Sequence, residues 1–194
     1  MQTLSSFANQ FVLHQTPTER YAKEFKFQPN AESKDAAVLV PIVEREHGLT
    51  VLLTQRAQHL RHHPGQISFP GGRRDPEDVD FIATALRESE EEIGLDPSLV
   101  SPLGWLPKHH TITNYSIYPL VGLIQNLNKL IINRDEVDEV FEVPLNHFLS
   151  RKDHYTVRPN YKNQRHRVHF MPYENKMIWG ATAAILDKLV SHFE

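Results

Sequence analysis

The stretch FPGGRRDPEDVDFIATALRESEEEIGL, residues 69–95, is the most informative part of this chain of 194 residues. It opens with a Pro-Gly-Gly turn at 70–72, and glycine allows a backbone to approach a ligand closely. Apolar residues then recur every three or four positions, which predicts a helix over 80–93 with one face toward a core. Gly94 suits the left-handed residue that commonly ends a helix, so the segment predicts a glycine turn followed by one bounded helix.

The predicted helix carries an acidic face. Glu88, Glu91 and Glu92 follow the i, i+3, i+4 spacing and therefore share one side. Like charges at this spacing destabilise a helix by about 0.2–0.5 kcal/mol per pair, and carboxylates are unfavourable near its C-terminus. A divalent cation would reverse both effects, because Mg²⁺ prefers carboxylate oxygens. Arg87 precedes Glu91 by four residues and can orient its carboxylate, although a solvated acidic surface is the alternative interpretation.

These residues carry a family resemblance. The segment RESEEEIGL at 87–95, behind FPGG at 69–72, resembles the Nudix box, G-x5-E-x7-R-E-U-x-E-E-x-G-U, where U is a bulky aliphatic residue. The second half matches at every specified position except the first U, which is Ser89. The first half is one residue longer than the pattern, so its glutamate has no clean counterpart. The role of Asp78, the nearest acidic residue, is therefore left open.

A second motif directly precedes the box. The segment 52–72, LLTQRAQHLRHHPGQISFPGG, is similar to L-L-T-x-R-[SA]-x3-R-x3-G-x3-F-P-G-G at every fixed position. That signature marks the coenzyme A pyrophosphatase branch of the Nudix family. The resemblance covers about residues 36–145, and WGATA at 179–183 looks like the C-terminal helix of the same branch. It implies an α/β/α sandwich, with 1–34 as an N-terminal extension and 35–194 as the Nudix hydrolase domain.

The resemblance also implies an activity. Enzymes of this branch hydrolyse the pyrophosphate bond of coenzyme A or its derivatives to 3′,5′-ADP and 4′-phosphopantetheine, using Mg²⁺ or Mn²⁺. The metal neutralises the phosphate charge and activates the attacking water. By this resemblance Glu88, Glu91 and Glu92 bind the metal, with the Gly71 carbonyl as an added ligand. Arg87 orients the carboxylates, and Glu88 is alternatively the general base.

Further charged residues are expected around this site. Guanidinium groups pair with phosphate bidentately, so Arg56 and Arg61 are our candidates for binding the substrate. The family often takes a further base or metal ligand from a loop after the box. The second acidic cluster, residues 135–142, is expected in and around such a loop. Within it Glu136 is our first choice for that role, and Glu139 is the second.

The strand pattern supports a mixed sheet. β-Branched runs at 36–43 and 49–54, joined by a polar turn, predict a hairpin. Other strands are expected at 67–69, 100–106, 117–125 and 167–173. A last amphipathic helix is expected at 179–193, and Pro144 is expected to open a short helix before it. Because strands flank one central helix and another closes the chain, we expect an α/β fold with helices on both sheet faces.

The composition restricts the kind of metal site. The chain contains no cysteine, which excludes disulfides, thiolate zinc sites and a cysteine nucleophile. Two histidine pairs, at 62–63 and 109–110, lack the i, i+4 spacing of a helical zinc site. We expect them to be polar loop residues, with phosphate contact as the alternative. A hard cation bound by oxygen is therefore the expected metal.

The overall charge is nearly balanced, with 21 Lys and Arg against 24 Asp and Glu and a pI near 6.5. We therefore expect a small-molecule substrate rather than a nucleic acid, which requires a basic face. The chain shows neither an apolar run of about 20 residues nor a secretion signal, so we expect a cytoplasmic protein without a membrane partner. The oligomeric state, including a homodimer, stays open.

Two rival functions use the same fold. A Nudix hydrolase of ADP-ribose or dinucleotides would share the metal helix, but the signature at 52–72 argues against it. A Nudix-like module that only senses a nucleotide would be expected to lose its metal carboxylates, and all three are present here. A Ser-His-Asp hydrolase is poorly supported, because no G-x-S-x-G elbow occurs.

Overall fold

The computed structural model describes residues 3–13, 33–127, 129–161 and 164–193. Its centre is an eight-stranded sheet, in which β3-β2-β1-β7-β5 form the main path while β4, β6 and β8 pair with β1, β7 and β2 respectively. These strands are β1 (Lys34–Arg45), β2 (Gly48–Arg56), β3 (Ile67–Ser68), β4 (Gly71–Arg73), β5 (Val100–Trp105), β6 (His109–His110), β7 (Tyr115–Ile124) and β8 (Val137–Pro144).

The sheet is mixed because β1 has neighbours of both orientations. It forms the expected antiparallel hairpin with β2, closing at the Arg45–Gly48 pair, where Gly48 takes a φ of 119°. On its other edge β1 runs parallel to β7, from the Lys34–Tyr115 pair to the Val43–Ile124 pair. A parallel pair needs a crossover connection, and the chain between β1 and β7 includes the predicted helix.

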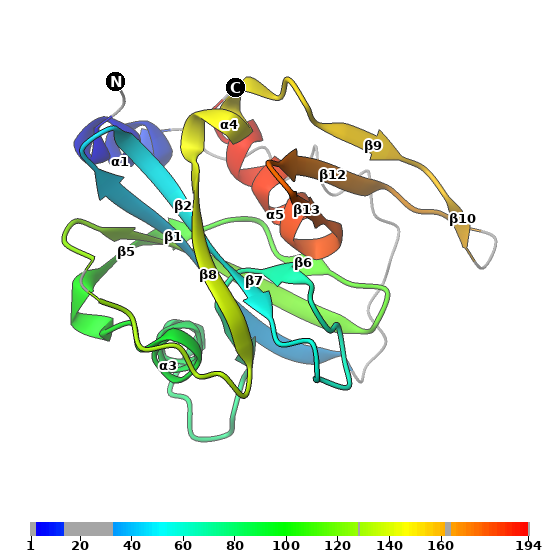
Figure 1. The fold of residues 1–194 in the computed structure, drawn as a ribbon, viewed down its shortest axis with the longest axis horizontal. Helices are drawn as coiled ribbons and strands as arrows, with labels where there is room; N and C mark the ends of the chain where they lie inside the picture. Colours follow the sequence, from blue (N-terminus) through cyan, green and yellow to red (C-terminus); the bar gives the residue numbers. More distant parts are fainter. Residues whose placement is uncertain (1–2, 14–32, 128, 162–163, 194) are drawn as a thin grey trace.

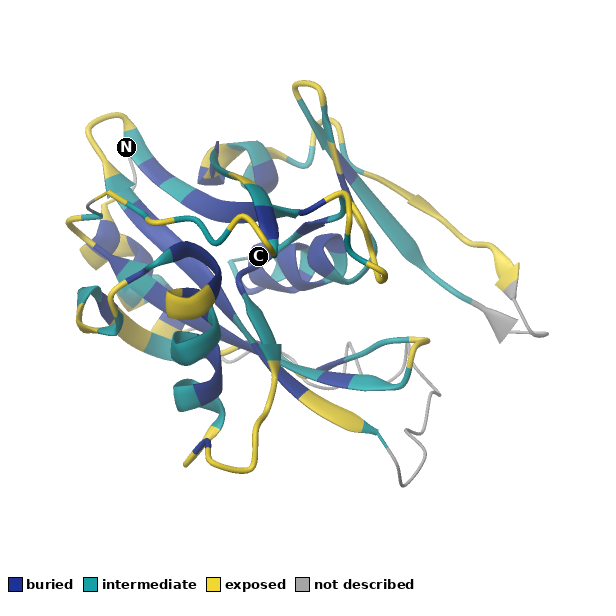
Figure 2. Cartoon of the chain, turned by 60° about the horizontal axis from the view of Figure 1, so that its bottom comes forward, coloured by how far each residue is buried: buried dark blue, intermediate teal, exposed yellow. Residues whose placement is uncertain are grey.

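Helices cover both faces of the sheet, as expected (Figures 1 and 2). One face packs against α3 (Phe81–Ile93) through an apolar cluster that includes Ala37, Leu39 and Leu52. The other face packs against α1 (Leu4–Leu13), α4 (Leu145–Ser150) and α5 (Gly180–Ser191). The alternation of side chains along β1 and β2 supplies both clusters, since successive residues point to opposite faces. The predicted α/β sandwich is therefore confirmed.

The first helix is packed against the last. Phe7 and Phe11 of α1 are buried, and the ring of Phe7 lies 4.8 Å from that of Phe193. His192 also donates a hydrogen bond of 2.6 Å from Nε2 to the Phe11 carbonyl. The rest of the predicted N-terminal extension, residues 14–32, lies outside the described residues, and the boundary at 34/35 stays a prediction.

A smaller antiparallel sheet follows α4. It consists of β9 (Tyr155–Val157), β12 (Val168–Tyr173) and β13 (Lys176–Trp179), in the order β13-β12-β9. A further short hairpin pairs β10 (Asn160–Tyr161) with β11 (Gln164–Arg165). Only the strand at 167–173 was expected from the sequence. Figure 1 shows this part of the chain extending away from the central sheet.

Two sequence expectations are wrong. Much of the acidic segment 135–142 is strand rather than loop, because β8 pairs with β2 from the Thr50–Pro144 pair to the Arg56–Val137 pair. The second histidine pair is not in a loop either: His109 and His110 form β6, paired with β7, and His109 is buried. The first pair, His62 and His63, does lie in an exposed loop. Among the described residues, none of the helices has the length and apolar character needed to cross a bilayer.

Candidate active site

The helix that carries the acidic face is fixed at both ends. Its N-cap is Asp80, whose side chain accepts a hydrogen bond of 2.8 Å from the Ala83 amide. At the other end Gly94 adopts the expected left-handed conformation, with a φ of 65°, and donates its amide to the Glu90 carbonyl. The helix α3 therefore ends close to the prediction, and its last two turns present the three glutamates.

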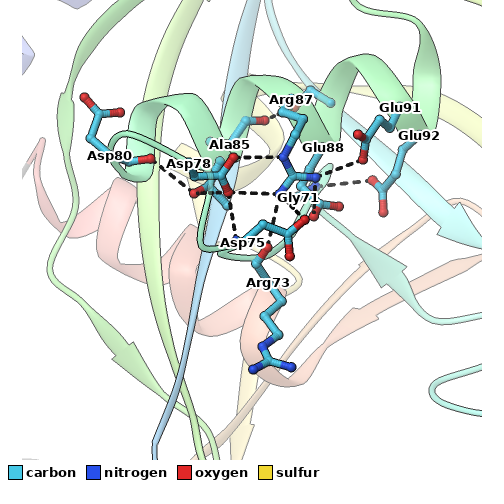
Figure 3. Close-up of polar contacts among 12 residues, drawn as sticks. Gly71, Arg73, Asp75, Asp78, Asp80, Ala85, Arg87, Glu88, Glu91 and Glu92 are labelled. Atoms are coloured by element: carbon cyan, nitrogen blue, oxygen red, sulfur yellow. Dashed lines mark hydrogen bonds and ion pairs between the residues drawn. The ribbon is translucent and has the colours of Figure 1, made fainter.

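Arg87 links these glutamates to the turn before the helix (Figure 3). Its Nη1 atom lies 3.0 Å from Glu88 Oε1 and 2.9 Å from Glu91 Oε2, which confirms the predicted contact with Glu91. Its Nε and Nη2 atoms donate to the two carboxylate oxygens of Asp78 at 2.9 and 3.0 Å. Nη2 also donates to the Arg73 carbonyl at 3.2 Å. One guanidinium group therefore holds three carboxylates and the β4 backbone in place, and a fourth carboxylate, that of Asp75, lies 3.7 Å from its Nη2 atom.

Asp78 is the anchor of this arginine, a role that the sequence left open. Besides the bidentate pair, it accepts hydrogen bonds of 2.9 Å from the Thr84 hydroxyl and from the Asp75 amide. The hydrogen bond from Arg87 is the main reason that its pKa lies far below the usual value, although burial opposes this shift. One signal in the sequence does indicate Asp78: the glutamate position of the Nudix box, counted forward from Gly72, falls on this residue. That the extra residue of the box is an insertion in the turn before the helix stays a prediction, and the anchor is formed in a chain that carries it.

Glu92 is the most buried of the three glutamates, with 2% of its surface exposed. Its Oε2 accepts a hydrogen bond of 3.2 Å from the Gly71 amide, and its Oε1 lies 3.8 Å from Arg56 Nη1. Burial raises its pKa to about 8, and the charges of Glu88 and Glu136 add to this effect. The chain therefore holds a carboxylate where its negative charge is poorly compensated.

Glu88 lies against the glycine turn. A Cβ added to Gly72 would come within 2.3 Å of Glu88 Oε2, so glycine is required for the carboxylate to occupy this position. Burial is the main cause that raises the pKa of Glu88, with contributions from Glu91 and Glu136, while Arg87 opposes the shift. Glu91 is more exposed, with 56% of its side chain accessible.

The structure separates the two candidates from the second acidic cluster. Glu136 lies in the turn before β8, where the Ala57 amide donates to its carbonyl at 2.9 Å, and its charge acts on Glu88 and Glu92. Glu139 instead forms an ion pair of 2.6 Å with Lys176. Of the two, Glu136 is therefore the residue that shares the electrostatic environment of the α3 carboxylates.

The two candidate substrate arginines have different surroundings. Arg56 ends β2 and turns its side chain toward Glu92, with 27% of that side chain exposed. Arg61 lies on the loop 57–66 and is exposed. The other signature residues maintain the backbone: Ala57 is completely buried, and Gly65 has a φ of 65°. The sequence motif thus brings one of its two arginines, Arg56, to the carboxylates of α3.

The donor set fits a hard divalent cation in its chemistry. Three carboxylates share one helix end, and burial together with mutual repulsion raises the pKa of Glu88 and of Glu92. Within the described ranges, however, no three His, Cys, Asp or Glu side chains are arranged to hold a metal ion. Arg87 and the Gly71 amide occupy the carboxylate oxygens instead. A carboxylate has two oxygens with two lone pairs each, so these hydrogen bonds leave acceptor positions open to a cation.

Comparison with known proteins identifies the family of this chain. Residues 33–172, more than half of the chain, match the family model described as the NUDIX domain. The chain belongs to the Nudix family. A protein of Yersinia pestis (strain Pestoides F) called "Uncharacterized Nudix hydrolase NudL" is 41% identical over 188 residues, covering 97% of this chain and 94% of the relative. A protein of the same name from Yersinia pseudotuberculosis (serotype O:1b) has the same identity and coverage.

Solved structures show the same Nudix fold. An Ap4A hydrolase from C. elegans, in a binary complex, aligns with a TM-score of 0.50 at 20% identity, covering 57% of this chain and 80% of that one. The Nudix hydrolase RenU from M. smegmatis aligns with a TM-score of 0.51 at 21% identity, covering 59% of this chain and 73% of that one. A MutT/nudix family protein from Enterococcus faecalis aligns with a TM-score of 0.51 at 15% identity, covering 97% of this chain and 73% of that one. At these identities the likeness concerns the fold alone.

Proposed function

We propose that this Nudix hydrolase cleaves the pyrophosphate bond of coenzyme A or a derivative, releasing 3′,5′-ADP and 4′-phosphopantetheine or its acylated form. The observation that carries the proposal is the contact between the two motifs. Arg56 belongs to the coenzyme A pyrophosphatase signature and Glu92 to the Nudix box, and their side chains lie 3.8 Å apart. This contact supports a site to which both motifs contribute.

Mg²⁺ or Mn²⁺ would neutralise the charge of the diphosphate and lower the pKa of the attacking water. Glu88, Glu91 and Glu92 would hold the cation, with the Gly71 carbonyl as an added ligand. Arg87, anchored by Asp78, keeps the carboxylates oriented. Glu136, or alternatively Glu88, would accept the proton of the attacking water. Arg56 and Arg61 would pair with the phosphates of the substrate, since guanidinium groups match phosphate oxygens bidentately.

A substrate panel tests the specificity. The purified protein is incubated with coenzyme A, ADP-ribose or NADH, each with Mg²⁺ or Mn²⁺, and kcat/KM is measured for every combination. We expect coenzyme A to exceed the other two by at least about tenfold, a difference of ~1.4 kcal/mol in transition-state stabilisation. A preference for ADP-ribose or NADH would assign the chain to the rival enzyme function. Binding of these compounds without turnover would assign it to the sensing module.

Matched variants test the carboxylates. We expect Glu91→Gln and Glu92→Gln to lower kcat by about 100-fold or more, because each removes one negative charge from the proposed metal shell. Glu90→Gln is the control, since Glu90 lies on the same helix turn but falls on the unspecified x position of the Nudix box. Full metal-dependent turnover by the Glu92→Gln protein would contradict the assignment of Glu92.

A further inference from the structure

The loop 57–66 carries part of the coenzyme A pyrophosphatase signature, and its C-terminal end is hydrogen-bonded to Arg56, the residue that precedes it. The Arg56 amide donates to the Gln66 carbonyl at 2.9 Å, and the Gly65 amide donates to the Arg56 carbonyl at 3.1 Å. Gly65 has a positive φ, and a Cβ at this position would lie 2.4 Å from Gln58 Nε2. The start of the loop is thereby held in one conformation at the end of β2.

Three consecutive residues of this loop contact the turn that precedes β8 and the start of that strand. The Ala57 amide donates to the Glu136 carbonyl at 2.9 Å, and the Gln58 amide donates to Asp138 Oδ2 at 3.0 Å. Next to them His59 Nε2 donates to the Asp135 carbonyl at 3.1 Å. The contacts therefore span residues 135–138, with Glu136 inside that span.

The same turn is attached to the metal helix on its other side. The Asn133 amide donates to the Glu92 carbonyl at 2.9 Å, and the Glu136 amide donates to the Asn133 carbonyl at 3.1 Å. Glu136 therefore lies between two fixed supports, the C-terminal end of α3 and the start of loop 57–66. Its charge acts on both Glu88 and Glu92.

We propose that residues 57–59 form a clamp that positions Glu136 beside the α3 carboxylates, with His59 and Asp138 as positioning residues. This inference rests on the proposed function in one respect, the action of Glu136 in hydrolysis. It gives the start of the signature loop a role separate from substrate contact. The competing explanation is that the loop acts through Arg61 on the substrate, and the two explanations predict different kinetic effects.

A double-mutant cycle separates them. We expect His59→Ala to lower kcat about tenfold with little change in KM, because a displaced general base or ligand weakens the chemical step. His59→Gln should restore most of the loss, since its amide can donate to the Asp135 carbonyl. In a Glu136→Gln background, His59→Ala should cause no further loss. A defect confined to KM, or one that persists in that background, would overturn the clamp.

A second readout does not depend on turnover. Hydrogen exchange of the metal-free protein is followed at the amides of Glu136 and Val137. His59→Ala and Asp138→Ala should accelerate exchange there while the α3 amides keep their protection. His47→Ala, in the exposed turn between β1 and β2, is the control and should change neither. Unchanged exchange in both the His59→Ala and the Asp138→Ala proteins would refute the clamp even if the enzyme hydrolyses coenzyme A. Faster exchange without hydrolysis would retain the clamp and reject the proposed function.

Discussion

A single guanidinium group, that of Arg87, compensates the negative charge of the Asp78, Glu88 and Glu91 side chains. These contacts differ in how far they are exposed to solvent. The Asp78 side chain is 6% exposed, whereas that of Glu91 is 56% exposed and is screened by water. Stability should therefore depend mainly on the Asp78 pair, while the exposed pair mainly sets the orientation of a carboxylate.

Asp78→Asn tests this division of roles. Removing one partner of a buried ion pair costs about 3 kcal/mol or more, and the remaining partners of Arg87 should keep the loss near that lower value. The pKa of Asp78 is lowered in the folded state, so its contribution is complete above its ordinary value of 3.8 and is lost as the pH falls below it. Denaturant unfolding from pH 7 to pH 3 should show this acid dependence in the wild type and a weaker one in the variant. Equal stability at pH 7 would contradict the anchor role.

Glu92→Gln is expected to stabilise the metal-free protein. The folded pKa of Glu92, about 8, lies above its ordinary value of 4.5, so the folded state binds a proton that the unfolded state releases between these pH values. Wild-type stability should therefore fall as the pH rises from 4.5 to 8, by an amount on the order of a few kcal/mol. Thermal unfolding with EDTA should show this slope in the wild type and lose it in Glu92→Gln. Identical pH profiles would contradict the unfavourable burial of this charge.

At the scale of the element, α3 depends on its caps because its acidic C-terminal turn opposes the helix dipole. Asp80→Ala removes the acceptor for the Ala83 amide and should lower the free energy of unfolding by about 1 kcal/mol. For a protein of this size the melting temperature should drop by roughly 2–4 °C. Asp80→Asn, which keeps a capping oxygen, is the matched control and should lose much less. An unchanged melting temperature for Asp80→Ala would show that tertiary packing alone holds the helix.

The sequence predicted the elements whose signals are local. The helix at 80–93 has apolar periodicity and a glycine end, and the hairpin at 36–54 has two β-branched runs around a polar turn. By contrast, β8 begins in an acidic run that resembles a solvated loop, and its strand character comes from pairing with β2, far away in the sequence. β9 and β13 are only 3 and 4 residues long, too short for periodicity to show.

At the scale of the whole molecule, α5 links the sheet face on which it packs to the segment just before β6. Lys188 on α5 is buried and donates to the carbonyls of Pro107 and Lys108 at 2.9 Å each. Beside this joint lies the buried His109, whose pKa is lowered to about 3 by burial first, and then by the charges of Lys188, His110 and His169. Burial and the charges of these three neighbours therefore all oppose protonation of His109.

Acid should lower the free energy of unfolding through His109. The folded pKa of His109 lies below its ordinary value of 6.5, so the unfolded state binds more protons between pH 6.5 and 3, and stability falls as the pH falls through that window. The contribution is at most several kcal/mol, at about 1.4 kcal/mol per pKa unit. His109→Asn should reduce the slope of unfolding free energy against pH in this window. An unaltered slope in His109→Asn would contradict this contribution of His109.

The candidate site was predictable where residues adjoin in one motif and unpredictable where folding brings them together. The spacing of Glu88, Glu91 and Glu92 placed them on one helix face, and Arg87 was expected to reach Glu91. The bidentate support from Asp78 required the actual path of the turn. The clamp on Glu136 depends on residues about 80 positions apart, as in the hydrogen bond from Gln58 to Asp138. No local pattern encodes such a contact.

The most direct measurement is product analysis after incubation of coenzyme A with the protein and Mg²⁺ or Mn²⁺. We predict equal amounts of 3′,5′-ADP and 4′-phosphopantetheine, formation that stops when EDTA removes the metal, and a loss of about 100-fold or more in the Glu92→Gln protein. The Glu90→Gln protein should form both products at the wild-type rate. Absence of 3′,5′-ADP with either metal, from protein that is folded and stable, would contradict the account.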